Sequence, residues 1–100
     1  MINHIVLFKL KEFENEDLKA VVRSKIKKAL LALKESISEI KFMKVGENYE
    51  LNSASYDIGL ITHFESIGDL TLYQIHPEHL KVIELVKQNT VEKAAVDFEF

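Results

Sequence analysis

Cysteine and tryptophan are absent from this sequence of 100 residues, while proline occurs once and glycine three times. Without cysteine the chain has no disulfide, no thiolate zinc site and no thiol nucleophile. The scarcity of glycine and proline leaves few positions for irregular loops or for the many turns of a β-sandwich. No linker rich in proline, glycine or serine divides the chain, and no internal repeat is visible. We therefore expect one domain over residues 1–100, built from a few long elements.

An excess of basic charge is also missing, since 13 Lys and Arg stand against 16 Asp and Glu and the net charge is −3. This balance argues against nucleic acid or an anionic membrane as the main partner. No apolar run approaches the roughly 18 residues that a membrane span needs. Residues 1–4 provide no basic leader ahead of the first apolar run. We expect a cytoplasmic protein with no membrane segment and no signal peptide.

Hydrophobic periodicity predicts four strands and two helical regions. The strands are predicted at residues 3–10, 40–45, 56–64 and 94–100, with a polar loop at 47–55. The first helix follows an acidic group, with Asn15 as its N-cap. The second helical region begins after Ser66 and breaks at Pro77, which opens a new helix. The order β-α-β-β-α-β is typical of the ferredoxin-like α+β fold, in which helices cover one face of a four-stranded antiparallel sheet.

The first predicted helix is amphipathic. Its apolar positions follow spacings of three and four: Leu18, Val21, Val22, Ile26, Ala29, Leu30 and Leu33. The opposite stripe carries Lys19, Arg23 and Lys27, which we interpret as a solvated helix face rather than a binding patch.

The strands at 3–10 and 56–64 are apolar on both faces. A strand of this kind is covered on both sides, and the helices of one chain cover only one side of the sheet. A second copy is the economical cover for the other side. The sequence therefore predicts a homodimer that forms through the open face of the sheet.

Histidines are the residues most able to carry chemistry, and two of them lie in the string Tyr73-Gln74-Ile75-His76-Pro77-Glu78-His79. If His76 caps the helix that Pro77 opens, His79 follows one turn later and faces the same way. Two imidazoles leave a metal short of ligands, so we expect no metal site. The alternative to a functional pair of histidines is that His76 only caps the helix and that His79 is a partly buried, hydrogen-bonded residue.

His4 shares its strand parity with Val6 and Phe8. If that parity faces the helices, His4 and His79 meet between helices and sheet. Burial there lowers the pKa of an imidazole, which can then act as a base near pH 7. Tyr73 adds a hydroxyl that can orient a substrate or hold an oxyanion, unless it is only a core ring.

The other polar residues indicate no second site. The sequence has no glycine-rich phosphate loop, no serine-centred nucleophile elbow and no carboxylates spaced for divalent metals. His63 lies on the parity expected to face the dimer partner. Asp97 and Glu99 are interpreted as an exposed edge or as pairing partners across the dimer.

Several strings together make this sequence resemble the stress-responsive A/B barrel (Dabb) family. They are His4-Ile5-Val6-Leu7-Phe8-Lys9, Val45-Gly46, Tyr56-Asp57, Tyr73-x-x-His76-Pro77-x-His79 and Val96-Asp97-Phe98. The likeness runs over essentially the whole chain. It implies a dimeric α/β barrel in which two ferredoxin-like chains meet, in agreement with the homodimer expected from the strands.

For activity, the resemblance implies several alternatives. One plant relative is a polyketide cyclase that closes a linear polyketone by an aldol condensation without a cofactor. By motif, its catalytic pair corresponds to Tyr73 and His79, with His4 as a further candidate. The expected pocket, for a small apolar or carbonyl-containing ligand, also includes His76, Ile26 and Leu30. The first helix offers no aromatic hydroxyl there, which departs from the cyclase.

We therefore expect a small-molecule pocket with an undetermined reaction and no cofactor. The first alternative is a cofactor-independent enzyme, similar to a cyclase, lyase or monooxygenase, that uses a histidine base and a tyrosine. The second is a non-catalytic, stress-related interaction or stability module.

Overall fold

The computed structural model describes residues 1–49 and 55–100. Seven elements follow one another along the chain: β1 (Ile2–Leu10), α1 (Glu16–Ser36), β2 (Phe42–Glu47), β3 (Ile58–Phe64), α2 (Ile67–Ile75), α3 (Pro77–Asn89) and β4 (Thr90–Glu99). The predicted polar loop at 47–55 lies partly outside the described residues. The described residues therefore contain the predicted order of elements, with the second helical region divided into α2 and α3.

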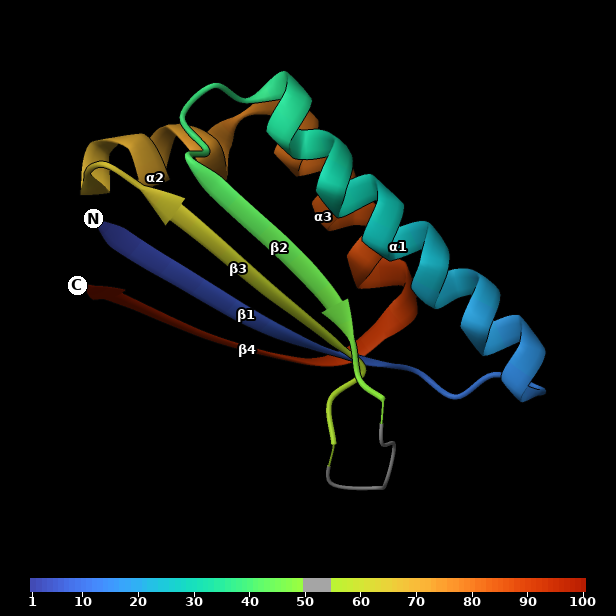
Figure 1. The fold of residues 1–100 in the computed structure, drawn as a ribbon. Coiled ribbons are helices and arrows are strands. Elements are labelled where there is room, and N and C mark those ends of the chain that lie inside the picture. Colours follow the sequence, from blue (N-terminus) through green and yellow to red (C-terminus); the bar gives the residue numbers. More distant parts are fainter. Residues whose placement is uncertain (50–54) are drawn as a thin grey trace.

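The four strands form one antiparallel sheet in the order β2-β3-β1-β4. All three helices lie on one side of this sheet, and α1 and α3 pack against each other above it (Figure 1). The predicted ferredoxin-like α+β fold is confirmed. No helix within the described residues is long and apolar enough to cross a membrane.

Capping side chains mark the residues at which the helices begin. Asn15 caps α1, where its side-chain oxygen accepts the Leu18 N–H at 2.8 Å. Ser66 caps α2 in the same way, and its hydroxyl accepts the Asp69 N–H at 3.1 Å. Each cap satisfies a backbone donor that the first turn of a helix leaves without a partner. Both positions agree with the sequence prediction.

The strand boundaries differ more from the prediction. β2 begins at Phe42, two residues later than expected, and β4 begins at Thr90, four residues earlier than expected. The early start of β4 comes from pairing with β1, since Lys93 faces Phe8 and Glu92 faces Lys9 across the ladder. A polar stretch gives no alternating pattern, so only the partner strand defines this part of β4.

The core lies between the helices and the sheet. Alternate residues of β1 point into it, because successive side chains of a strand face opposite sides. The helix-facing set of β1 is Ile2, His4, Val6, Phe8 and Leu10, all of them buried. From above, α1 adds Ile26, Leu30 and Leu33. Each fully buried aliphatic or aromatic side chain contributes about 1.5–3 kcal/mol to stability.

The basic stripe of α1 is not the solvated face that we expected. Lys19 lies 3.3 Å from the carboxylate of Asp57, and Arg23 lies 3.4 Å from that of Glu47. Both basic side chains are partly buried. The reason is tertiary, since α1 packs against β2 and brings this stripe over the end of the sheet. At these two positions the prediction of a solvated face was wrong.

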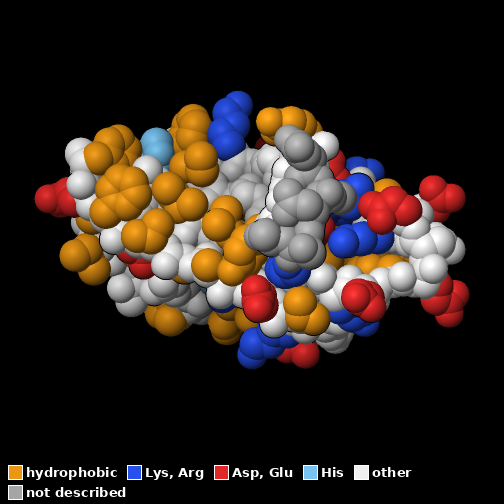
Figure 2. All heavy atoms as spheres, turned by 90° about the horizontal axis from the view of Figure 1, so that it is seen from below, with side chains coloured by type: hydrophobic (Ala, Val, Ile, Leu, Met, Phe, Trp, Pro, Cys, Tyr) orange, Lys and Arg blue, Asp and Glu red, His pale blue; other side chains and the backbone are white. Residues whose placement is uncertain are grey.

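The other face of the sheet is apolar and is not covered by any of the described residues. Hydrophobic side chains gather on it, as Figure 2 shows from below. Its exposed large side chains are Leu7, Phe42, Ile61, Val96, Phe98 and Phe100. His63 lies on the same face, with its ring stacked 4.5 Å from that of Phe42 and 4.9 Å from that of Phe100. We call this set of residues the open face.

Asp57 joins the strands to α1 and gives the first prediction. Its carboxylate is buried, accepts the Leu10 N–H at 2.7 Å and pairs with Lys19. Asp57→Ala leaves that N–H and a partly buried ammonium without a partner, so we expect a loss of about 3 kcal/mol in the free energy of unfolding. Urea denaturation measures it. The exposed Glu65→Ala is the control, expected within about 0.5 kcal/mol of the native protein. An equal effect of both changes contradicts the prediction.

Candidate functional site

A cavity of about 580 Å³ lies between α3 and the sheet. β1 and β4 form its floor, and α3 forms its roof, with contributions from α1, α2 and β3. Its polar residues at one end are His4, Tyr73, Gln74, His79 and Asp97. Its apolar walls include Val6, Phe8, Leu30, Leu60, Val82, Ile83, Val86 and Ala95. The cavity combines an apolar surface with a few converging polar groups, which is the usual character of a small-molecule site.

His79 is placed by the break between α2 and α3. The His76 Nδ1 accepts the Glu78 N–H at 3.1 Å and caps α3, whose first residue is Pro77. His79 follows in the first turn of α3, and its Nδ1–H donates to the Gln74 carbonyl at 3.1 Å. Since a carbonyl can only accept, this bond puts the proton of a neutral His79 on Nδ1. The lone pair is then on Nε2, which has no hydrogen-bond partner among the described residues.

The surroundings of His79 keep its ring neutral. Partial burial is the main cause that lowers the pKa of His79 below its ordinary value of 6.5. The bond to Gln74 opposes this effect, while the nearby charges of His4, Lys93 and His76 add to it. A neutral imidazole at pH 7 can accept a proton.

Tyr73 lies at the end of α2, directly between the two histidines. Its ring centre is 4.2 Å from that of His79, 6.1 Å from that of His4 and 5.0 Å from that of Phe64. Burial raises the pKa of Tyr73 to about 12, so the hydroxyl stays protonated at pH 7. This hydroxyl has no hydrogen-bond partner within the part of the chain that the structure describes. It is therefore available to donate to an oxygen atom of a ligand.

Asp97 belongs to this site, although we expected it at an exposed edge or across a dimer. The ladder of β1 and β4 places it opposite His4, and the His4 Nδ1–H donates to its carboxylate. Asp97 is exposed on the edge strand β4, as expected, but its pairing with His4 was not expected. The apolar residues of β4 face the open side, which turns Asp97 toward the helices. The alternation of Val96, Phe98 and Phe100 puts Asp97 on the opposite face of β4, but only the pairing with β1 places it beside His4.

The other predicted pocket residues divide into two groups. Leu30 lines the cavity, whereas Ile26 and His76 are absent from the described lining. Ile26 lies one turn before Leu30 on α1 and is completely buried in the core. His76 uses its Nδ1 as the cap of α3. The structure thus brings His4, Leu30, Tyr73 and His79 to one cavity and leaves the other two outside it.

The donor set limits what the site can hold. No group of three or more His, Asp and Glu side chains in the described ranges is arranged to hold a metal ion. Two imidazoles, a phenol and a carboxylate converge at one end of an apolar cavity. Such a set can bind a polar oxygen atom, accept a proton and stabilise a negative charge that develops on that oxygen.

The fold and the site define an α+β protein of the ferredoxin-like class with a cavity between helices and sheet. The family model of the stress responsive A/B barrel domain, Dabb, matches residues 2–100. The chain therefore belongs to the Dabb family. No protein with curated annotation matches the sequence.

Solved structures share this fold over nearly the whole chain. A dimeric, ferredoxin-like protein of unknown function from Bacteroides fragilis is 35% identical, with a TM-score of 0.86 and coverage of 99% of this chain and 95% of that one. A second dimeric ferredoxin-like protein, from Thermobifida fusca, is 24% identical, with a TM-score of 0.83 and coverage of 99% and 90%. The hydroxynitrile lyase of Passiflora edulis is 15% identical, with a TM-score of 0.80 and coverage of 97% and 90%. These last two show the likeness of the fold alone.

The electrostatics of His79 give the second prediction. We expect its imidazole to titrate below pH 6.5, and the ring to be neutral at pH 7, because burial and nearby positive charge disfavour the imidazolium. Proton NMR of the ring hydrogens against pH measures the midpoint. Lys93→Gln removes one of the positive charges and should raise the midpoint of His79 toward 6.5. A midpoint above 6.5 in the native protein contradicts the prediction.

Proposed function

We propose that this Dabb domain binds a small, mainly apolar carbonyl compound in the cavity and that His79 acts on it as a general base. The observation that carries the proposal is the pairing of His79 and Tyr73, whose rings lie 4.2 Å apart in the wall of one cavity. His79 offers an unprotonated nitrogen, and Tyr73 offers a hydroxyl that stays protonated.

The proposed step uses these two groups on neighbouring atoms of the ligand. The Nε2 of His79 takes a proton from the carbon next to the carbonyl. The electron pair of that C–H bond moves into the new C=C bond, and the carbonyl oxygen gains the negative charge. Tyr73 donates a hydrogen bond to this oxygen, which stabilises the enolate. The proton remains on His79 until the enolate is protonated again or attacks a second carbonyl.

His4 and Leu30 complete the proposed site. Asp97 fixes the ring of His4 through Nδ1, which leaves the Nε2 side for the ligand. Leu30 contributes apolar surface from α1. His76 acts on the site as the cap that starts α3 one turn before His79, and Ile26 acts as core support on α1.

Two alternatives remain for this cavity. A reaction of lyase, cyclase or monooxygenase type follows if the enolate or another intermediate goes on to react, and a protein of this fold is a hydroxynitrile lyase in Passiflora edulis. A non-catalytic stability or interaction module binds no carbonyl compound and exchanges no proton. Proton abstraction by a general base distinguishes these reactions from the non-catalytic module, because it is a step of the proposed enzymatic reactions and the module lacks it.

Deuterium exchange tests the general base and is the third prediction. In D₂O, the native protein should exchange the hydrogens next to the carbonyl of small methyl ketones faster than buffer alone, as followed by proton NMR. His79→Ala should lower the protein-dependent rate by about a hundredfold or more, since it removes the base. Tyr73→Phe should lower it as well, because it removes only the hydroxyl.

His63→Gln is the matched control, since His63 lies on the open face and not in the described lining of the cavity. It should exchange at the native rate. A rate unchanged by His79→Ala refutes the base. Melting curves with each ketone then distinguish a binding protein from a module without a ligand, because only a bound ligand raises the melting temperature.

We further propose that two copies of the chain associate through the open face. An uncovered apolar face of this kind marks an interaction surface in a protein with a single helical layer. The relatives from Bacteroides fragilis and Thermobifida fusca are described as dimeric, which supports a second copy as the partner. A two-fold axis lets the same patch meet itself, as in most homodimers.

The fourth prediction concerns this interface. Val96 is 53% exposed on the open face, and Val21 is 64% exposed on α1. Val96→Glu places a charge between the two sheets and should raise the dissociation constant of the dimer at least about a hundredfold. Val21→Glu makes the same change outside the open face and should leave the dimer intact. Light scattering across a concentration series measures both, and dissociation by both variants or by neither contradicts the proposed face.

A further inference from the structure

The cavity has two chemically different ends, because α3 runs directly into β4. α3 ends at Asn89, and β4 begins at Thr90, so the two elements diverge from a common vertex (Figure 1). Residues late in α3 and early in β4 therefore lie at the vertex end. Residues early in α3 and late in β4 lie at the opposite end, where His79 and Asp97 are found.

Two lysines line the vertex end. Lys87 follows His79 by eight residues on α3, which is about 12 Å at the rise of an α-helix. Lys93 precedes Asp97 by four residues on β4, which is about 13 Å at the rise of a strand. The two elements thus place the backbone positions of both lysines at a similar distance along the cavity from the polar end that holds His79. Between the ends lie the apolar side chains of Val82, Val86 and Ala95.

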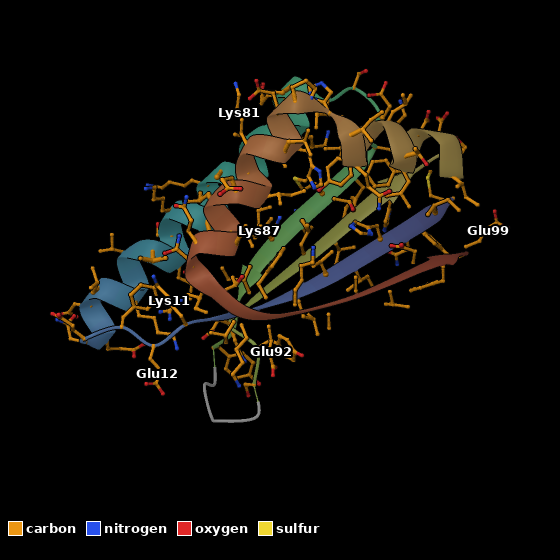
Figure 3. The ribbon with its side chains drawn as sticks, turned by 180° about the vertical axis from the view of Figure 1, so that it is seen from behind. Lys11, Glu12, Lys81, Lys87, Glu92 and Glu99 are labelled. Atoms are coloured by element: carbon orange, nitrogen blue, oxygen red, sulfur yellow. The ribbon has the colours of Figure 1, made fainter. Side chains whose placement is uncertain are left out.

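Neither lysine forms an ion pair within the described residues. By contrast, Lys81 of the same helix lies outside the lining and is paired with Glu78 at 3.1 Å. Figure 3 shows Lys87 on the side of α3 toward the strands and Lys81 on its outer side. Glu92 also lines the vertex end, but it lies directly opposite Lys9 in the ladder and so faces a cation on the neighbouring strand.

We propose that Lys87 and Lys93 bind a carboxylate, so that the ligand of this cavity is an oxo carboxylate with an apolar chain between its two polar ends. The inference rests on the proposed function, since the carbonyl group of this ligand occupies the end of the cavity formed by His79 and Tyr73. The chain then lies along Val82 and Val86, and the carboxylate lies between the two ammonium groups.

The charges in the cavity support this orientation of the ligand. Asp97 makes the far end unfavourable for a second anion, whereas the vertex end has two cations against the single Glu92. Lys93 is also close enough to His79 to disfavour its protonation, so a charge at the vertex end influences the proposed base. A carboxylate bound at Lys93 partly offsets that charge without approaching the base itself.

The fifth prediction tests the carboxylate with a straight-chain methyl ketone that ends in a carboxylate, with five or six methylenes between the two groups. Its methyl ester keeps the length and the ketone but removes the charge. Calorimetry should give an affinity about tenfold higher for the acid than for the ester. Lys87→Gln and Lys93→Gln should each reduce this preference, and the double variant should abolish it. Lys81→Gln changes the net charge by the same amount on the same helix and should keep it.

The outcomes separate this inference from the proposed function. Equal affinity for acid and ester in the native protein, or an equal loss in Lys81→Gln, overturns the carboxylate site and leaves the carbonyl site in place. Failure of both acid and ester to bind overturns both proposals. Melting curves without ligand confirm that each lysine variant is folded, which is expected because both side chains are exposed.

Discussion

The antiparallel pairing of β1 with β4 decides which side chains the cavity receives, because the side chains of paired strands alternate together between the two faces. In the observed register His4 faces Asp97, and Phe8 faces Lys93, all on the side of the helices. Ile5 faces Val96 on the open face. A shift by one residue in β4 exchanges its two faces, putting Val96 into the cavity and Asp97 into the apolar face. The hydrophobic difference between these faces therefore stabilises the register and the site together.

The direct passage from α3 to β4 adds a second constraint. The Asn89 carbonyl accepts the Lys11 N–H at 2.9 Å, and the Thr90 hydroxyl donates to the Val86 carbonyl at 2.9 Å. These bonds hold the vertex at the end of β1 without a loop. The cavity between α3 and the strands therefore opens away from the vertex, and its polar groups collect where α2 ends and α3 begins. The arrangement of the candidate site thus depends on a helix cap and a strand register, which place His79 and His4 on either side of Tyr73.

Sequence reasoning succeeded where the determining interactions are local. The caps at Asn15, Ser66 and His76 each involve a backbone group two or three residues away, so composition and spacing suffice to predict them. It failed where the partner is distant in the chain. Asp97 is 93 residues from His4, and Lys19 is 38 residues from Asp57, so their roles depend on register and packing that no local pattern contains. The alternating pattern of β4 was visible in the sequence, but the sequence did not show which face of β4 turns toward the helices.

The two faces of β1 make the open face relevant to the chemistry of the cavity. His4 points into the cavity, while its neighbours Asn3 and Ile5 point to the open face, so one backbone segment contributes to both. In the proposed dimer, the partner covers the open face and removes water from the outer side of the ladder that joins His4 to Asp97. Backbone hydrogen bonds that are shielded on both sides open less often, and the geometry of the His4–Asp97 pair is then held more narrowly. The proposed association of two chains through the open face would therefore stabilise the site from behind.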